Sequence, residues 1–397
     1  MAHDTPPLHL AVALDGAGRH PASWRDPSAA AGELFTPGYW TALVAEAQSG
    51  TLDFVTFEDR LTLQSTRPDG PDGRADQVRG TLAALPLAAR TAPATSHVGL
   101  VPAVTVTHTE PFHTSRAVAT LDFVAGGRAG WCAQVARRPE EAGHFDPRLR
   151  PAGEPTGPAE AWAEAADYVE VVRRLWDSWE DDAEIRDPAT GRYLDADRLH
   201  RVGFRGRWFS VEGPSVTPRP PQGQPPVCAL ADTEEALRFA AASADVVFVT
   251  PHSPQEARDL VARVREEQRA VDRAGETVHV FADLAVALDA EPGQAARRLA
   301  ALDALDASPP DDGAALFAGT PAQLADRLAL WADAGLTGFR LRPVVLPYDL
   351  RQITRSLVQL LRARGAFRAD YEASTLRGLL GLARPANRYA RTDWRSS

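Results

Sequence analysis

The sequence predicts an α/β protein built as a closed (β/α)8 barrel, with insertions and a C-terminal extension, in one domain over residues 1–397. Short runs of apolar, β-branched residues alternate with longer amphipathic segments roughly eight times, a pattern typical of a parallel sheet covered by helices. With 397 residues, 44% of them hydrophobic, the chain is long enough to close this barrel, known as a TIM barrel. A doubly wound open sheet is the alternative, but no GxGxxG motif follows the first predicted strand.

The first half of the chain supplies four of the predicted units. Apolar runs favour strands at residues 8–14, 53–57, 98–107 and 129–135. Helices are predicted at 39–49, 75–91 and 111–124 and, after a Pro/Gly-rich loop at 144–158, at 159–180. Pro111 opens the third of these helices at its first turn, and two glycines, Gly126 and Gly127, follow its end.

The second half continues the alternation. Strands are predicted at 227–230, 246–249, 278–288 and 339–341, and helices at 233–243, 254–274, 293–306, 321–334 and 349–364. Residues 181–215 are charged and aromatic without a clear period, and we interpret them as an insertion. Residues 367–397 are too polar and irregular for a barrel unit, and we expect a C-terminal extension there.

Composition excludes several function classes. The chain has 43 basic and 53 acidic residues and a formal net charge of −10, which argues against nucleic acid as a partner. Lysine is absent from the sequence, so Schiff-base catalysis and a Walker-type phosphate loop are excluded. Cys132 and Cys228 are the only cysteines and form no CxxC pair, which excludes a zinc cluster and a disulfide scaffold.

The sequence favours a cytoplasmic protein. Its first residues, MAHDTPPLHLAVAL, lack the basic region and the long apolar run of a signal peptide. No apolar stretch approaches the ~18 residues that a membrane span needs, so we expect no membrane association. No residue is assigned to a metal site.

Several stretches, in order along the chain, carry a resemblance to a known family. They are GAGRHPASWRDP (16–27), LDFVTFEDRL (52–61), HVGLVPAVTVTHTEPFHTSR (97–116), LDFVAGGRAGW (121–131), YVEVVRRLWDSWEDDA (168–183) and the tail segment at 362–390. The sequence resembles the bacterial luciferase-like flavin-dependent monooxygenases, in the branch of the nitrilotriacetate and dibenzothiophene-sulfone monooxygenases, as a divergent bacterial member. The similarity extends over nearly the whole chain.

The resemblance implies a flavoprotein enzyme with a defined set of partners. It would bind reduced FMN supplied by a separate flavin reductase and use O2 to oxygenate a small organic substrate. The cofactor carries the difficult chemistry, and the protein orients it and keeps water away. In the family the C-terminal extension wraps a neighbouring subunit, which implies a homodimer or homotetramer. The site would lie at the C-terminal ends of the barrel strands.

Several residues match the family's site. Asp59 matches a flavin-site aspartate, although a helix cap or loop carboxylate is the structural alternative. Thr105 and Thr107 lie on one face of their strand and match a Ser/Thr run that contacts the flavin ring, although threonine is common in strands. The proposed catalytic residues are His20 and His108, because a histidine at the mouth can exchange protons near neutral pH. A structural role is the alternative for both.

Two tryptophans are assigned to substrate binding. Trp24 matches the tryptophan that follows the first strand in the family, and Trp131 ends the GGRAGW signature. His113 lies in a first helical turn and is expected to be structural.

Other positions depart from the family while remaining cofactor-site candidates. Cys132 stands where relatives have a flavin-facing asparagine, followed by Gln134 and Ala136 in place of a polar row. Pro158 and Trp162 replace a His and a Tyr that hold the phosphate side of the flavin.

The phosphate-binding turn departs as well. Asp232 and Thr233 replace serines there, just before a helix whose N-terminus would otherwise attract an anion. We expect Asp232 to cap this helix and to repel a phosphate, by ~4 kcal/mol for two unit charges ~4 Å apart in a partly screened site. FMN binding is thus expected to be weakened or lost unless substitutes hold it.

Two arginines alternate with apolar residues in the last predicted strand. Arg340 and Arg342 therefore point to the same side, where they would bind an anionic substrate or a displaced flavin phosphate. An ion pair with a helix carboxylate is the structural alternative.

The departures leave other functions open beside the monooxygenase. The chain would then be a family member that has lost flavin and serves as a cofactor-free enzyme or a small-molecule binding protein. A further alternative is a non-catalytic subunit that pairs with an active homologue.

Overall fold

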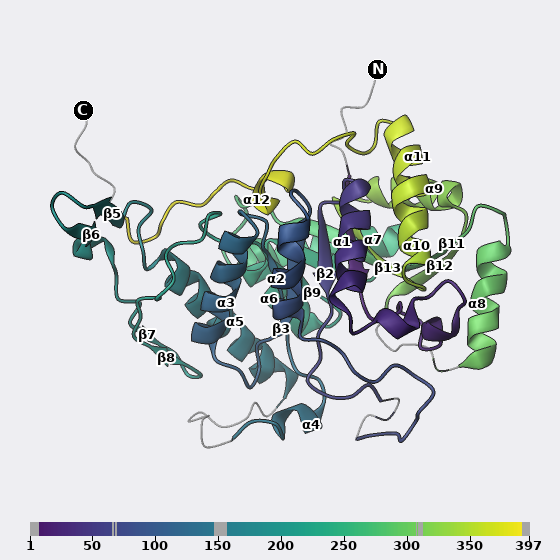
Figure 1. The fold of residues 1–397 in the computed structure, drawn as a ribbon, viewed down its shortest axis with the longest axis horizontal. Helices are drawn as coiled ribbons and strands as arrows, with labels where there is room; N and C mark the ends of the chain where they lie inside the picture. The colour runs from purple at the N-terminus through teal and green to yellow at the C-terminus, as the bar shows by residue number, and fades with distance from the viewer. Residues whose placement is uncertain are drawn as a thin grey trace.

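The computed structural model describes residues 8–65, 67, 70–146, 157–306, 308 and 313–390. Eight parallel strands close a barrel, because β1 pairs with β2 on one side and with β13 on the other, and β10 pairs with β11. They are β1 (His9–Leu14), β2 (Phe54–Phe57), β3 (Gly99–Thr105), β4 (Trp131–Gln134), β9 (Val227–Leu230), β10 (Val246–Val249), β11 (His279–Leu288) and β13 (Gly338–Pro343). The expected TIM barrel is confirmed (Figure 1).

Helices surround the barrel between consecutive strands (Figure 1). They are α1 (Pro37–Ser49), α2 (Ala84–Thr91), α3 (Pro111–Val124), α5 (Pro158–Asp177), α6 (Glu234–Ser243), α7 (Pro254–Ala270), α8 (Gln294–Leu305), α9 (Pro321–Ala332), α10 (Tyr348–Gln352) and α11 (Val358–Ala363). Their starts follow the sequence, since hydroxyls of Thr36, Ser253 and Thr320 accept a backbone N–H of the first turn and proline opens each of these three helices.

Two elements differ from the prediction. Residues 75–83 are not helical, and α2 begins only at Ala84, because this segment instead packs on other loops, where the indole N–H of Trp24 donates to the Asp76 carbonyl (3.0 Å). An additional strand, β12 (Ala315–Gly319), pairs with the second half of β11. Its residues, ALFAG, form a short apolar run that the prediction missed, and their burial alternates, as in a strand at a sheet edge.

The N-terminal half of the barrel interior contains a cluster of aromatic rings and is closed by the tail. Phe54, Phe248 and Phe281 pack together with ring centroids 5.9 to 6.4 Å apart. The short helix α12 (Leu376–Leu379) lies against them, and Leu376 fits between strands so closely that a Cβ on Gly99 would lie 2.7 Å from its methyl group. The extension, expected to be polar, therefore contributes buried leucines to its own barrel.

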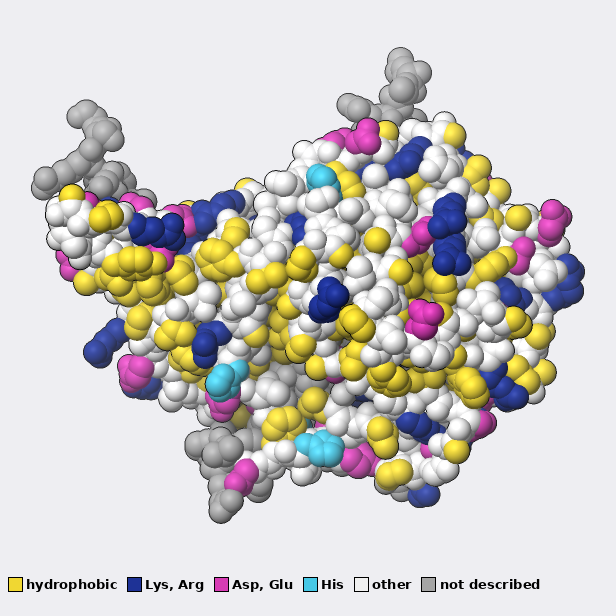
Figure 2. All heavy atoms as spheres, in the orientation of Figure 1, with side chains coloured by type: hydrophobic (Ala, Val, Ile, Leu, Met, Phe, Trp, Pro, Cys, Tyr) yellow, Lys and Arg dark blue, Asp and Glu magenta, His cyan; other side chains and the backbone are white. Residues whose placement is uncertain are grey.

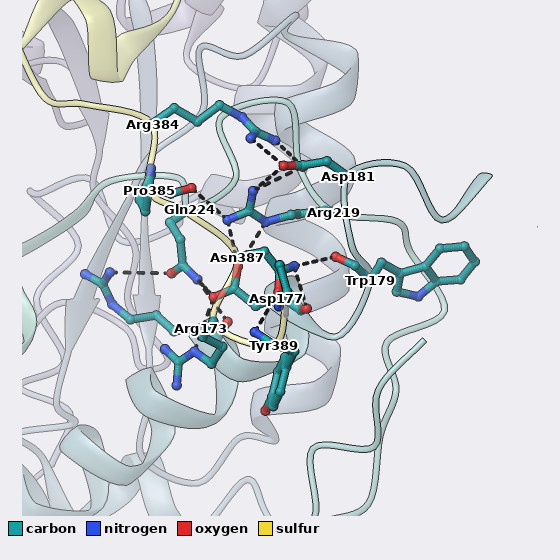
Figure 3. Close-up of polar contacts among 12 residues, drawn as sticks. Arg173, Asp177, Trp179, Asp181, Arg219, Gln224, Arg384, Pro385, Asn387 and Tyr389 are labelled. Carbon is teal, nitrogen blue, oxygen red and sulfur yellow. Dashed lines mark hydrogen bonds and ion pairs between the residues drawn. The ribbon is translucent and has the colours of Figure 1, made fainter. Parts of the chain in front are cut away.

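The remaining tail binds the base of the insertion. The Arg219 side chain is buried and donates to Asp177 (2.9 Å) and to Asp181, while Arg384 pairs with Asp181 and the Asn387 amide donates to the carbonyls of residues 177 and 179 (Figure 3). Residues 391–397 of the predicted extension lie outside the described part.

The predicted insertion forms two small hairpins. They are β5 (Glu184–Asp187) with β6 (Arg192–Leu194), and β7 (Phe204–Arg205) with β8 (Ser210–Val211). In Figure 1, β5 and β6 lie beside the C-terminal tail, far from the short helix α4 (Pro139–Ala142), which follows β4 at the opposite end of the barrel. Among the described helices, none is both long and apolar enough to cross a membrane.

Candidate functional site

The C-terminal ends of the strands, which we call the mouth, contain a cavity of about 830 Å³. Its walls come from the loops after β1, β2 and β4 and from Arg342 on β13. Arg19 and Arg342, which are far apart in the sequence, line the same cavity because β1 and β13 pair where the barrel closes. Active sites of this fold lie at this end.

Three of the predicted cofactor-binding residues meet at the mouth. The Gln134 amide donates to the Thr105 hydroxyl (3.1 Å) and to the backbone carbonyl of Asp59 (3.0 Å). The Asp59 carboxylate accepts from the backbone N–H groups of Arg60 (2.8 Å) and Ala84 (2.9 Å). Burial raises the pKa of Asp59, and the two backbone donors oppose this rise. Asp59 thus holds the start of α2 and orients the polar group beside β3 and β4.

The next two candidates on this wall follow β3. The Thr107 hydroxyl is buried and accepts from the backbone N–H of Ala136 (2.8 Å), so it ties the ends of β3 and β4 together. His108 has a left-handed backbone (φ 67°) and its ring stacks on Phe145 with centroids 5.5 Å apart. A non-glycine residue in this conformation is uncommon. The catalytic role of His108 stays a prediction.

Trp131 and Cys132 are consecutive residues of β4, so their side chains point to opposite faces of the strand. Trp131 is fully buried outside the barrel, against Tyr168 of α5 at 6.4 Å between centroids, and it does not line the cavity. Its assignment to substrate binding is therefore not supported by its position. Cys132 faces the barrel interior, where burial raises the pKa of its thiol to about 12. This thiol remains protonated at neutral pH.

The start of α6 differs from the expectation for Asp232. Thr233 caps the helix, since its hydroxyl accepts from the Ala236 N–H (3.2 Å). Asp232 instead pairs with Arg137, which lies in the loop after β4 (2.7 Å), and its Oδ1 is buried and has no hydrogen-bond partner among the described residues. Trp162 of α5 packs on Phe239 of α6, with centroids 5.0 Å apart. An unpaired buried acceptor is costly, so this position suits a hydrogen-bond donor that the described chain does not supply.

The two arginines of β13 point into the barrel, as expected from their alternation. Arg340 forms two hydrogen bonds to Asp283 of β11 (2.7 and 2.9 Å), its register neighbour, and Arg342 reaches the same carboxylate (3.3 Å). The partner is thus a strand carboxylate rather than a helix carboxylate. Burial acts to raise the pKa of Asp283, but Arg340 and Arg342 outweigh it and hold that pKa below its usual range. Arg340 also lies 4.1 Å above the Phe248 ring.

Other charged side chains lie at the mouth near the Asp283–Arg340 pair. Arg60 pairs with both carboxylate oxygens of Asp15 (3.0 Å each), and Glu58 lies 3.4 Å from Arg340. The pKa of Arg19, which lines the cavity, falls to about 10 because of burial and then of repulsion by Arg342. Burial and the nearby Arg342 therefore disfavour the cationic form of Arg19.

The two remaining candidates follow β1. His20 lines the cavity, but its Nδ1 accepts from the Ala22 N–H (3.0 Å) and its Nε2 lies 3.1 Å from Asp303. Both ring nitrogens thus bond within the chain, which favours the structural alternative. Trp24 is half-buried and donates to the Asp76 carbonyl, and it is not among the cavity-lining residues. This favours a role in holding the loop.

Sequence reasoning missed several residues of the mouth. Asp283 interrupts the apolar run HVFADLAVAL, and that interruption was the available signal for a buried ion pair. Arg137 and Arg138 follow shortly after the end of β4 and carried a weaker signal, two adjacent arginines near a strand end. No group of three or more His, Cys, Asp or Glu side chains among the described residues is arranged to hold a metal ion.

Comparison with known proteins agrees with this architecture. A family model described as luciferase-like monooxygenase matches residues 17–310. The chain belongs to the luciferase-like monooxygenase family. This membership confirms the resemblance seen in the sequence and the enzyme class, a flavin-dependent monooxygenase.

Individual relatives of this luciferase-like monooxygenase cover nearly its whole length. It is 29% identical to N-acetyl-S-(2-succino)cysteine monooxygenase of Bacillus subtilis (strain 168), over 97% of this chain and 98% of that protein. It is 27% identical to nitrilotriacetate monooxygenase component A of Aminobacter aminovorans, over 97% and 98%. The crystal structure of long-chain alkane monooxygenase has the same fold, with a TM-score of 0.84 at 23% identity over 95% of this chain and 96% of that one.

The residues at the mouth fit a flavin in part. The Asp59–Thr105–Gln134 group offers polar atoms beside β3 and β4, where the resemblance places the flavin ring. At α6, Arg137 is a cation for a phosphate, and the unpaired Oδ1 of Asp232 is an acceptor for a hydroxyl. These atoms suit a polyol phosphate better than a phosphate alone.

Proposed function

We propose that this protein is a cytoplasmic, FMN-dependent two-component monooxygenase that oxidises a small organic substrate with O2. Reduced flavin would come from a partner reductase, and the enzyme would act as a homodimer or homotetramer. The observation that carries the proposal is the cavity at the mouth in a chain of this family, at the same end of the barrel as the polar group of Asp59, Thr105 and Gln134, which is not among the cavity-lining residues. The name of one relative, a monooxygenase component A, supports an enzyme that works with a second component.

The chain's own residues would perform binding and orientation. When bound, reduced flavin supplies the electrons with which O2 is activated. Thr105 and Gln134 would orient the ring, Arg137 would hold the phosphate, and Asp232 would accept a hydrogen bond from the ribityl chain. The loops after β1 and β2 would enclose the site and limit the access of water.

The names of the relatives offer two kinds of substrate. Those named for N-acetyl-S-(2-succino)cysteine and for nitrilotriacetate act on carboxylated compounds, whereas long-chain alkane monooxygenase acts on an uncharged one. Arginines in the cavity wall support the first kind.

Anaerobic titration with reduced FMN, followed by protein fluorescence, tests the proposal. We expect saturable binding, with a dissociation constant in about the micromolar range. Binding of reduced but not oxidised FMN would still agree with a two-component enzyme. Absence of reduced-FMN binding would overturn the proposal and leave the cofactor-free enzyme, the binding protein or the non-catalytic subunit. Native mass spectrometry with and without a homologue then separates the subunit role from the others.

Asp232→Ser is the matched test of the phosphate side. Removing this carboxylate relieves its repulsion of a phosphate, so FMN affinity should rise relative to riboflavin affinity. An unchanged ratio would contradict the placement of the phosphate beside Arg137.

A further inference from the structure

Several polar side chains of the mouth cavity already have partners within the chain. Arg60 pairs with Asp15, and it also donates to the Oε1 of Gln64 (3.2 Å). The Arg138 guanidinium donates to two backbone carbonyls of the loop after β2. Gln77 is different. Among the buried side-chain nitrogen and oxygen atoms that lack a partner in the described structure, its Oε1 is the one that belongs to the cavity lining.

The orientation of the Gln77 amide is fixed by Asp306. The Nε2 of Gln77 donates to the Asp306 carboxylate (2.5 Å), and both residues are buried. Burial acts to raise the pKa of Asp306, but hydrogen bonds from Gln77, the Ser308 N–H and Arg74 outweigh it and lower that pKa to about 2. Asp306 is therefore a carboxylate at neutral pH and can only accept hydrogen bonds. A turned amide would place Oε1 against this carboxylate, so Oε1 faces away from it.

The unpaired Oε1 of Gln77 is an acceptor in the cavity wall. A buried acceptor without a partner costs free energy, which an N–H or O–H group of a ligand would recover. Gln77 is 7% exposed and lies in the segment 75–83, which forms neither a helix nor a strand. A small shift of this segment would therefore bring the oxygen to a ligand without moving a strand of the barrel.

The same cavity also has an apolar part. Its apolar side chains from α1 and from the loops after β1 and β2 include Leu34, Phe35, Trp40, Val78 and Leu82. The Phe35 ring lies so close to Gly80 that a Cβ on this glycine would be 3.2 Å from it. The indole N–H of Trp40 donates to the Leu34 carbonyl (2.8 Å), so it is not free for a ligand. On the face shown in Figure 2, by contrast, apolar side chains are interspersed with polar and charged ones.

We infer that Gln77 is a substrate-binding residue that accepts a hydrogen bond from an N–H or O–H group of a substrate whose apolar body packs on this apolar part. Binding pockets commonly combine apolar walls with a few polar groups that fix the orientation of the ligand. The inference rests on the proposed function, because it concerns the substrate of the same cavity. An analogue of the same shape without the donor would leave Oε1 unpaired and bind more weakly.

Indole and benzofuran, which have nearly the same shape and differ in the N–H group, test the inference in ligand-observed NMR titrations. The wild type should bind indole at least about fivefold more tightly than benzofuran, as a net hydrogen bond to a buried neutral group provides. Gln77→Met removes the acceptor and should abolish this preference. Gln64→Met is the matched control, because this glutamine lines the same cavity and its Oε1 already accepts from Arg60. It should keep the preference for indole.

The wild-type comparison needs no variant and decides even if Gln77→Met does not fold. Equal affinity for the two probes, or no binding of either, in protein that binds reduced FMN would overturn the inference alone. A preference for indole that Gln77→Met retains would also overturn it, since another acceptor would then be responsible.

Titration of the same proteins with reduced FMN separates the inference from the proposed function. A preference for indole that depends on Gln77, in protein that does not bind reduced FMN, would support the binding role of Gln77 and overturn the proposed function. If saturating reduced FMN abolishes indole binding and Gln77→Met weakens FMN binding, the acceptor serves the flavin and the inference is wrong.

Discussion

The two ends of the barrel treat buried charge differently. At the N-terminal end, the buried carboxylates of Asp53 and Asp245 are paired with arginines of the same chain. Asp53 pairs with His9 (2.8 Å) and Arg368 (2.6 Å), and Arg173 pairs with Asp245 (2.9 Å). At the mouth, arginines pair with carboxylates of other strands and loops, and two acceptor oxygens, of Gln77 and Asp232, have no partner in the described structure. The closed end thus pairs these buried carboxylates with its own arginines, whereas the two oxygens at the mouth are positions where a ligand would find acceptors.

The largest loss of stability is expected for a change at Asp283, in the barrel interior next to the mouth. Asp283→Asn leaves Arg340 and Arg342 in the barrel interior without their shared counter-charge. Breaking a buried pair costs about 3 to 5 kcal/mol, so the free energy of unfolding in urea should fall by this amount. Asp333→Asn, at an exposed position, is the control. A loss below about 1 kcal/mol would show that the arginines find other partners or solvent.

The next largest loss of stability is expected for a change in α12, the short helix that closes the N-terminal end of the barrel. Leu376 is fully buried against Phe54 and Phe281, and Leu376→Ala should create a cavity there. Such changes cost about 2 to 5 kcal/mol, and we expect a loss near 3 kcal/mol in the same assay. Leu330→Ala, at a position 59% exposed, should be nearly neutral. Equal stability of the two variants would mean that α12 does not seal the barrel.

A titrating group at the closed end should give a smaller, pH-dependent effect. Burial, and then repulsion by His9, lowers the pKa of His279 to about 4, and its Nε2 donates to the Leu380 carbonyl (2.7 Å). Between pH ~6.5 and about 4, the unfolded chain binds a proton that the folded protein does not. The contribution of His279 is thus complete above pH ~6.5 and is lost as the pH falls towards about 4.

Urea unfolding at pH ~7.5 and ~4.5 measures this contribution. His279→Gln removes the titration, so the variant should lose about 2 kcal/mol less than the wild type between these two pH values. His252→Gln, an exposed histidine, should behave as the wild type. An unchanged difference for His279→Gln would place the acid sensitivity elsewhere.

The sequence predicts the framework better than the mouth. Strands 227–230 and 246–249 have the bounds expected from their apolar runs, because burial on both faces leaves a continuous hydrophobic signal. The GGRAGW signature predicts the family, and its Arg128 has a structural role. This side chain donates to the carbonyls of Ala92, Val98 and Ala125 and so joins three loops at the closed end.

The pairs at the mouth were beyond sequence reasoning for a physical reason. Arg137 meets Asp232, and Asp283 meets Arg340, only because barrel closure brings distant strands together in a particular register. We expected Asp232 to cap α6, but Thr233 does so. Aspartate and threonine are both good caps, and the direction in which the chain enters the helix decides which of the two residues takes this role. Trp131 illustrates the same limit, since a shift of one residue moves a side chain to the other face of a strand.

The most direct test compares one arginine from each end in ligand-free protein. Arg368→Gln should lower the free energy of unfolding by about 3 kcal/mol, because Asp53 loses a buried partner. Arg137→Gln should lower it by less than about 1 kcal/mol, because the Arg137 side chain that pairs with Asp232 at the mouth is 58% exposed. Destabilisation of similar size in both variants would contradict the account, since the arginines of the mouth would then serve the fold rather than a ligand.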